Sequence, residues 1–398
     1  MLILWLALLF IIVFWAVILG INRRYNLKKR NIEVAPGILM WRTTRGLKFI
    51  DRVATSHRSG WRTFGTAAAI VGFGFMVFMF VNMVLNAALI ITRPEVAPTG
   101  VRLVIPGLTI PLFEGLFAIV TVLLVHEFAH GFVLRAQGLP TKAVGAMVFI
   151  AIPGAFVEPD EKRLRAAPVP QRLRVYGAGS FANILFALLC LVILLIVVVP
   201  LPGVYVWATS ENENVPAHDN LLPGMRLYSI AVNENAAVTL NSWQDFDNVM
   251  ENVHPGDNLK IVTSDNTITL TTVRHPDNEN RGYLGVVTIS AFSRSDFINP
   301  LFTLAVISYG VMGYPVFHPY CNNSYLPWPI VSVLTWMFLL NFAIGLFNML
   351  PAIPLDGGYI FSGLVETRTS PKTARRVAIA LSLVVLALIV ISFLPSLW

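Results

Sequence analysis

Residues 112–134 read LFEGLFAIVTVLLVHEFAHGFVL, an apolar stretch with the segment HEFAH at positions 126–130. About 20 apolar residues are enough to cross a bilayer as a helix. On a helix, residues i and i+4 lie on the same face. His126 and His130 can therefore reach one metal ion, with Glu127 beside them to act on a bound water. The stretch predicts a metal site at membrane depth.

The composition of the whole chain agrees with a membrane protein. Of its 398 residues, 56% are hydrophobic and 13% are charged, whereas a soluble domain carries about 25% charged residues. The mean hydropathy is +0.68. This excludes a large soluble enzyme. The formal net charge of +7 lies mostly in loops that flank apolar runs, where it orients a protein in the membrane, so it does not indicate nucleic-acid binding.

Apolar runs predict a polytopic α-helical membrane protein with about six transmembrane helices. The expected spans are residues 1–20, 66–91, 112–134, 175–199, 328–350 and 374–394. The first is expected to be a signal anchor with its N-terminus outside. Cation-rich segments at 22–65, 135–174 and 359–373 should be cytoplasmic by the positive-inside rule. That rule holds at every loop if residues 298–316, interrupted by Pro and Gly, form an interfacial or re-entrant segment.

A polar module interrupts the membrane chain at residues 203–292. Alternating strand-like runs, the turn at 255–257 and a capping box at Ser242 and Asp245 predict a small α+β domain, facing outside by the alternation of spans. The domain division is then a signal anchor with a basic loop (1–65), a membrane domain with HEFAH (66–200), the module (203–292) and a second membrane domain (293–398).

The polar cluster on the third span has two interpretations. A carboxylate at membrane depth costs about 3 kcal/mol, and such residues are functional by default. Zinc suits two imidazoles and a carboxylate, because it lowers the pKa of a bound water to about 7. The alternative is a relay for ions or protons in a transporter, but no internal repeat of the transporter kind is found. A third interpretation is an inactive scaffold that presents the polar module to partners. A pseudo-enzyme tends to lose a metal ligand or the base, and none of these residues is lost here.

A candidate for the missing protein ligand follows the fifth span. Catalytic zinc sites usually have three protein ligands and water. Residues 348–358 read NMLPAIPLDGG; the prolines end the helix and the glycines permit close backbone approach. Asp356 therefore lies on irregular backbone, near the cytoplasmic side, at a depth that matches HEFAH. We expect Asp356 to be the third ligand.

These motifs together resemble the site-2 protease family of intramembrane metalloproteases. The resemblance is carried by HEFAH, by Leu355-Asp356-Gly357, by the Gly-x-x-x-Asn element at 179–183 and by an Asn eight residues before the Asp. It implies Zn²⁺ bound by His126, His130 and Asp356, Glu127 as general base, and substrate contacts from Asn183 and Asn348. The alternative for each asparagine is an interhelical hydrogen bond.

The same resemblance implies further features. Residues 145–157 resemble a membrane-associated β-hairpin that offers an edge to an extended substrate; a re-entrant packing segment is the alternative. The module at 203–292 resembles a PDZ domain. In this family such a domain resembles a size filter or a reader of trimmed substrate ends; a structural insert is the alternative. The expected partners are membrane lipid and a single-span membrane protein already cut by another protease, in regulated intramembrane proteolysis, with the cell membrane as location.

Overall fold

The computed structural model describes residues 2–93, 104–150, 152–201, 203–210, 212–290, 296–311, 317 and 322–393. The chain divides into two compact units. The first comprises Met1–Leu103, Phe117–Ala187 and Leu340–Trp398, and the second comprises Val104–Leu116 and Leu188–Leu339. Each unit thus combines segments that are far apart in the sequence, and the first holds all the candidate site residues.

Five helices among the described residues are long and apolar enough to cross a membrane. They are α3 (Arg58–Thr92), α4 (Leu112–Ala136), α6 (Val169–Val197), α9 (Trp328–Phe347) and α11 (Pro371–Ser392). Each contains most of a predicted span, and the chain is a polytopic membrane protein. The first predicted span falls on α1 (Leu2–Tyr25); its crossing, and hence a total of six spans, stays a prediction.

Helix α3 differs from its prediction at one end. It begins at Arg58 instead of about residue 66, and it is 35 residues long. The added turns are polar, with Arg58, Ser59 and Arg62 among them. Hydropathy marks only the part of a helix that suits lipid, so it misses turns that continue beyond the apolar run.

The first unit also contains an antiparallel sheet of four strands, in the order β1-β2-β3-β4. The strands are β1 (Ile32–Ala35), β2 (Ile38–Thr43), β3 (Thr141–Phe149) and β4 (Ile152–Pro159). The β3–β4 hairpin, with Val144 opposite Val157, occupies the segment expected to form one. The β1–β2 hairpin was not predicted; it lies in the basic segment 22–65 and extends the sheet through β2 and β3.

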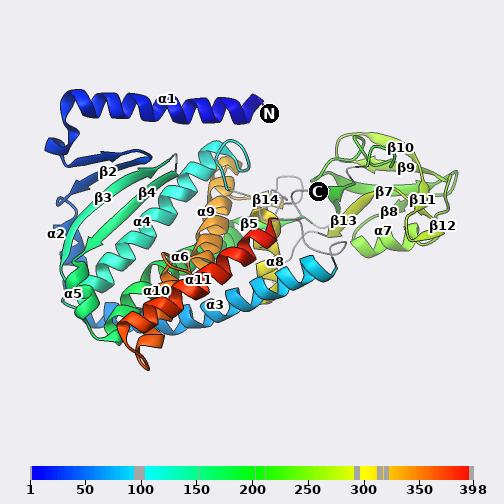
Figure 1. The fold of residues 1–398 in the computed structure, drawn as a ribbon. Helices are drawn as coiled ribbons and strands as arrows, with labels where there is room; N and C mark the ends of the chain where they lie inside the picture. The colour runs from blue at the N-terminus through cyan, green and yellow to red at the C-terminus, as the bar shows by residue number, and fades with distance from the viewer. Residues whose placement is uncertain are drawn as a thin grey trace. The chain divides into compact units, whose positions relative to one another are not determined.

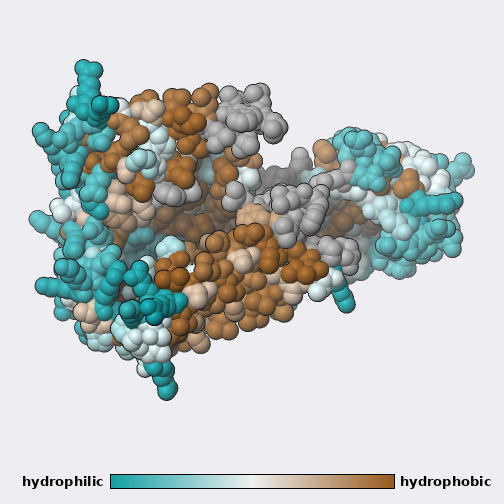
Figure 2. Space-filling model, viewed as in Figure 1, coloured by the Kyte–Doolittle hydropathy of each residue, from teal (hydrophilic) through white to brown (hydrophobic). Residues whose placement is uncertain are grey.

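Short helices complete the first unit: η1 (Leu27–Arg30), α2 (Leu47–Ser56), α5 (Glu161–Ala166) and α10 (Asp356–Glu366). Helix α10 lies beside α11 and α3 (Figure 1). Hydrophilic residues gather at the end of this unit where α2, α5 and the α10–α11 turn lie, whereas hydrophobic residues cover α11 and α3 (Figure 2). Exposed apolar side chains such as Ile70, Leu85, Leu383 and Val390 are what a bilayer requires.

The second unit holds the polar module as a β-sheet with one helix. The strand order is β10-β9-β7-β6-β13, with the short β8 (Val238–Thr239) paired to β7. The strands are β6 (Val204–Thr209), β7 (Arg226–Val232), β9 (Asn258–Thr263), β10 (Thr267–Thr271) and β13 (Val286–Ser290), and β11 (Val273–His275) pairs with β12 (Asn278–Tyr283). Leu227, Ile230, Leu259 and Ile261 are fully buried in its core.

Helix α7 (Trp243–Met250) of the module begins as the sequence predicts. The Ser242 and Asp245 side chains form the reciprocal capping box, in which the Ser242 amide donates to Asp245 Oδ2 at 2.8 Å. Phe246, Met250 and Val253 are buried against the sheet. An α+β module is therefore present; its PDZ-like identity and the four predicted domain boundaries stay predictions.

The rest of the second unit contains three short elements and part of the segment expected to be interfacial. They are β5 (Val198–Pro200) paired with β14 (Asn322–Ser324), the turn η3 (Asp296–Ile298) and α8 (Pro300–Val311). Helix α8 has 12 described residues, fewer than the roughly 20 of a span. Positions 312–316 of that segment lie outside the described residues, so its interfacial nature stays a prediction.

Candidate metal centre

The two histidines of HEFAH meet on one face of α4. Their spacing of four residues brings the rings within 4.6 Å, centroid to centroid. The two Nε2 atoms are 3.1 Å apart. Both side chains are largely buried, with exposed fractions of 13% and 17%, so the pair points into the protein and away from the lipid-facing side of the helix.

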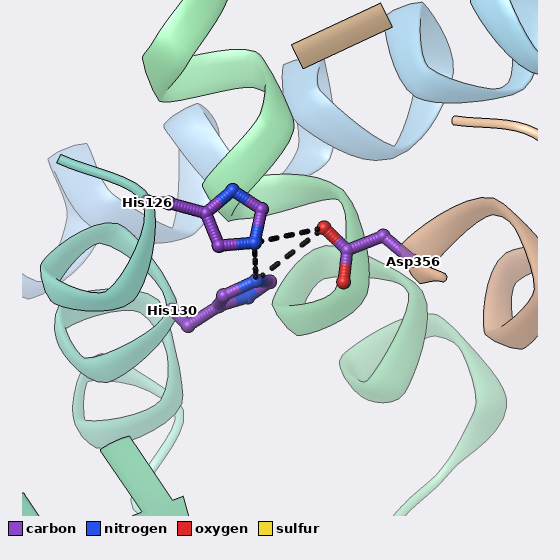
Figure 3. Close-up of side chains that lie close together, drawn as sticks. All are labelled: His126, His130 and Asp356. Carbon is purple, nitrogen blue, oxygen red and sulfur yellow. Dashed lines mark hydrogen bonds and ion pairs between the residues drawn. The ribbon is translucent and has the colours of Figure 1, made fainter. Parts of the chain in front are cut away.

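Asp356 reaches this pair from the start of α10. The chain leaves α9, turns at 348–355 and enters α10 through Leu355, an extended N-cap residue. The Gly357 amide donates to the Asn348 carbonyl at 2.8 Å. A Cβ at Gly357 would lie 2.1 Å from the Met349 carbonyl oxygen, so the turn requires glycine there. It directs Asp356 Oδ2 to 3.4 Å from each Nε2 (Figure 3).

The three candidate ligand atoms have the separations of a tetrahedral zinc site. They lie 3.1, 3.4 and 3.4 Å from one another. With zinc–ligand bonds of about 2.0–2.1 Å, two corners of a tetrahedron are about 3.3 Å apart. His126, His130 and Asp356 would therefore together hold one ion.

The backbone of α6 sets the tautomer of His130. His130 Nδ1 lies 2.7 Å from the Val175 carbonyl oxygen. A carbonyl can only accept, so Nδ1 carries the proton and Nε2 presents its lone pair toward Asp356 and His126. Metal-bound histidines typically donate their other ring N–H in this way.

Asn183 takes the corresponding position beside His126. Its side chain is fully buried, and Nδ2 lies 3.4 Å from His126 Nδ1. Within the described part of the chain, Oδ1 has no hydrogen-bond partner. For His126 Nε2 to bind metal, Nδ1 must carry the proton and donate it. The side-chain amide can be turned by 180° so that Oδ1 and Nδ2 change places, because the two atoms are nearly indistinguishable by shape. Oδ1 then accepts the Nδ1 proton of His126, and both side chains have a partner.

Helix α6 also supports the carboxylate, and it does so at very close range. Ser180 is fully buried and its Oγ donates to Asp356 Oδ2 at 3.0 Å. A Cβ on the preceding Gly179 would lie 2.4 Å from His130 Nε2 and 2.7 Å from His126 Nδ1. A glycine at 179 therefore lets α6 approach the two rings closely enough for Ser180 and Asn183 to reach the ligands.

Glu127 is held by the sheet. The Val157 amide on β4 donates to Glu127 Oε2 at 2.9 Å. This bond ties one carboxylate oxygen to the backbone and leaves the other to act on a water. The carboxylate thus comes from α4 and its orientation comes from β4, two elements that both belong to the first unit.

The structure brings together His126, His130 and Asp356, with Asn183 next to them. Asn348 is half-buried at the end of α9; its carbonyl binds Gly357, and among the described residues its side-chain amide has no hydrogen bond. Contacts of either asparagine with substrate stay predictions.

Three contributors to the site were not predicted: the Ser180 hydroxyl, the Val175 carbonyl and the Val157 amide. Ser180 could have been found, since it precedes Asn183 by one helical turn and so shares its face. A backbone carbonyl leaves no trace in a sequence.

The comparison with known families decides the class of the protein. The family model of peptidase family M50 matches residues 114–392, which include HEFAH and Asp356. This chain belongs to peptidase family M50. The family predicted from its motifs, that of the site-2 proteases, is thereby confirmed, and its members are membrane metallopeptidases that use zinc.

A relative of this M50 member has been found in an archaeon. The chain is 26% identical over 366 residues to a protein of Methanocaldococcus jannaschii that is named only as uncharacterized. The alignment covers 89% of this chain and 84% of that protein. The similarity therefore extends over nearly the whole length, including the polar module, but it names no substrate.

Proposed function

We propose that this M50 member is a zinc-dependent endopeptidase that hydrolyses peptide bonds within or next to the membrane-spanning segment of a membrane-anchored protein. One observation carries the proposal: the ligand atoms of His126, His130 and Asp356 are 3.1–3.4 Å apart, as tetrahedral zinc requires. The position of HEFAH in a candidate membrane span supports hydrolysis at membrane depth.

The chemistry divides between the metal and the chain. Zinc, when bound, supplies a Lewis acid for the scissile carbonyl and for a water. Glu127 takes a proton from that water and passes it to the leaving amine. The Val157 amide holds Oε2, so Oε1 is the oxygen that carries the proton. Asn183 and Ser180 act through the ligands, because their described hydrogen bonds go to His126 and Asp356.

The outer edge of β4 suits an extended substrate. β4 is the last strand of its sheet, and the Val157 amide points away from β3, toward Glu127. In an antiparallel strand, alternate residues direct their amides to the same side. Positions 153 and 159 on that side are prolines, which lack a backbone N–H, so the Ala155 amide is the donor that we propose for a substrate strand. A substrate strand paired there would run beside Glu127, and the Asn348 side chain is available for a second contact.

The substrate we propose is a single-span protein already shortened outside by another protease, so that the second cut completes regulated intramembrane proteolysis. A helix hides its peptide bonds, and substrates with Gly, Pro or Asn near the cut should be favoured because these residues weaken helices. We place the protein in the cell membrane with the 203–292 module outside and cation-rich segments inside. The cation-rich segments support this sidedness, because loops rich in Lys and Arg stay on the cytoplasmic side.

The test uses detergent-purified full-length protein. Wild type should hold about one zinc per chain, and His126→Ala and His130→Ala should each lose it. Glu127→Gln should keep zinc and lose activity by about 10²–10⁴-fold. Photocrosslinking of Glu127→Gln in its native membranes identifies the single-span proteins that it binds. These proteins, in uncrosslinked form, are then incubated with wild type in liposomes.

Two results would reject the proposal. Full zinc content in His130→Ala would reject the ligand set. Cleavage by Glu127→Gln at near wild-type rate would reject the general base, and proton or ion flux through liposomes that depends on Glu127 would favour a transporter. Sidedness is tested separately, with Glu279→Cys in the module and Lys28→Cys on η1, in a Cys321→Ser background. Membrane-impermeant labelling of whole cells should modify Glu279→Cys only.

A further inference from the structure

A basic cavity lies apart from the metal centre, where α6, α10 and α11 meet. Its volume is about 600 Å³. Five cationic side chains line it: Arg165, Arg172, Lys372, Arg375 and Arg376. Glu366 is the only carboxylate among the described residues that line it. All of these residues belong to the first unit.

The positive charge of this cavity is mostly not neutralised. Arg165 pairs with Glu161 at 2.8 Å and Arg172 with Glu366 at 2.7 Å. Lys372, Arg375 and Arg376 form no ion pair with any residue in the described part of the chain. These three positively charged side chains repel one another across the cavity, and an anion bound between them would relieve that repulsion.

Arg172 gives a second sign of a ligand. Only 8% of it is exposed, and its buried Nε has no hydrogen-bond partner among the residues that the structure describes. Leaving a buried donor without a partner is energetically costly, so such groups normally have one. A guanidinium presents its donors as a planar fork that matches the oxygens of a phosphate. One arm of the fork already binds Glu366, and the Nε remains.

The position of the cavity is that of a lipid headgroup. Arg172 and Tyr176 lie in the first two turns of α6, and Lys372 and Arg375 in the first two turns of α11. Both helices are candidate membrane spans, so their first turns lie at the level of the headgroups. Tyr176 stacks on Tyr359 with ring centroids 5.2 Å apart, and tyrosine is enriched at this depth.

An apolar surface continues from the cavity along α11. Ile353 and Ile379 line the cavity itself. Leu383 and Leu386, one and two turns further along α11, are exposed. Figure 2 shows the hydrophobic face of α11 directly beside the hydrophilic end of the unit. A ligand with an anionic head and long apolar chains would fit both surfaces, whereas a free anion would use only the first.

We propose that this cavity binds the phosphate headgroup of an anionic phospholipid, with its acyl chains along α11. Arg172, Lys372, Arg375 and Arg376 contact the phosphate, and Tyr176 and Tyr359 form the wall behind it. Basic pockets between membrane helices on the cytoplasmic side bind such headgroups.

Native mass spectrometry of the full-length protein, released from nanodiscs, tests this. The nanodiscs contain phosphatidylcholine with or without phosphatidylglycerol. Wild type should retain phosphatidylglycerol in preference to phosphatidylcholine. Lys372→Gln/Arg375→Gln/Arg376→Gln should weaken that binding on the order of 100-fold, since each cation contributes about fivefold. The charge-keeping variant Lys372→Arg/Arg375→Lys/Arg376→Lys should bind nearly as wild type does, which shows that lost charge and not misfolding causes the effect.

The matched control removes three cations elsewhere. Lys28→Gln/Lys29→Gln/Arg30→Gln on η1, outside the cavity, should leave phosphatidylglycerol bound. Equal losses in the two triple variants would overturn the proposal in favour of diffuse attraction. Retention of both lipids alike would also overturn it. Release of phosphatidylglycerol by equimolar inorganic phosphate would assign the cavity to a free anion and reject the lipid.

Discussion

Ser180 Oγ donates a hydrogen bond to Asp356 Oδ2 at 3.0 Å, across 176 residues of sequence. The same oxygen lies 3.4 Å from both imidazole Nε2 atoms. The bond joins α6 to the start of α10, so it orients a carboxylate that irregular backbone alone would hold loosely. Ser180 is a positioning residue for the metal centre.

Removal of this hydroxyl should weaken zinc binding. Ser180→Ala is expected to lower zinc affinity by about 10–100-fold, the usual effect of losing a partner of a metal ligand. Competition with a zinc-selective chelator measures the affinity. The control is Ser392→Ala, whose hydroxyl donates to the Leu388 carbonyl of its own helix; this variant should not change the affinity. Unchanged affinity in Ser180→Ala would show that the turn at 348–355 alone orients Asp356.

The role of Asn183 can be separated into metal support and substrate contact. If Oδ1 accepts the His126 Nδ1 proton, Asn183→Ala should lower zinc affinity about tenfold. Asn183→Asp keeps the acceptor and should retain the metal. Chelator competition gives the affinity, and steady-state cleavage gives KM. Normal zinc affinity with a raised KM in Asn183→Ala would instead favour the substrate contact that the family resemblance implies.

A single methyl group at position 179 should disrupt the site. The Cβ of Gly179→Ala would lie 2.4 Å from His130 Nε2, so α6 and α4 must separate or the ring must turn away. We expect loss of most bound zinc, measured by elemental analysis. Gly74→Ala on α3, where a Cβ meets nothing within 4 Å, is the control and should keep the metal. Normal zinc content in Gly179→Ala would contradict the close approach of the two helices.

The outer edge of β4 can be tested by removing one donor. Ala155→Pro deletes the amide that we expect to pair with substrate, without changing Glu127 or the ligands. KM should rise by roughly tenfold for one such hydrogen bond, while zinc content stays at one per chain. Ala155→Val keeps the amide and should behave as wild type. Equal KM values for both variants would mean that substrate does not pair with this edge.

The capping box of the module predicts a dependence on pH. Amides of Asn241 and Ser242 donate to Asp245 and hold its pKa below the ordinary value of 3.8. A carboxyl with a lowered folded pKa contributes stability that is complete above 3.8 and is lost as pH falls through the folded value. Hydrogen exchange should therefore show weaker protection of these amides below about pH 3.8.

A neighbouring pair of variants provides the control for this dependence. Asp245→Ala should lose the protection of the two amides already at pH 6. Asp247 lies on the same helix as Asp245 and pairs with Arg281. Asp247→Ala should leave the protection of the Asn241 and Ser242 amides intact. If both variants exchanged alike, the effect would come from general loss of helix stability and not from the cap.

The sequence alone determined which helices are apolar enough to cross a membrane and which residues could bind metal. Apolar runs report burial in lipid directly, because charged groups are costly there, and an i, i+4 pair of histidines is a local property of one helix. The capping box was readable for the same reason: its partners are three residues apart. Only the ends of helices such as α3, which continue as polar turns, escaped this signal.

Tertiary structure alone decided how those residues are held. The Ser180–Asp356 and Val157–Glu127 bonds join residues 176 and 30 positions apart, and the β1–β2 hairpin adds to a sheet whose other half comes a hundred residues later. Such contacts depend on how helices pack and on where backbone carbonyls and amides point. A sequence pattern contains neither the packing of the helices nor the direction of their backbone groups, because both depend on segments that only folding brings together.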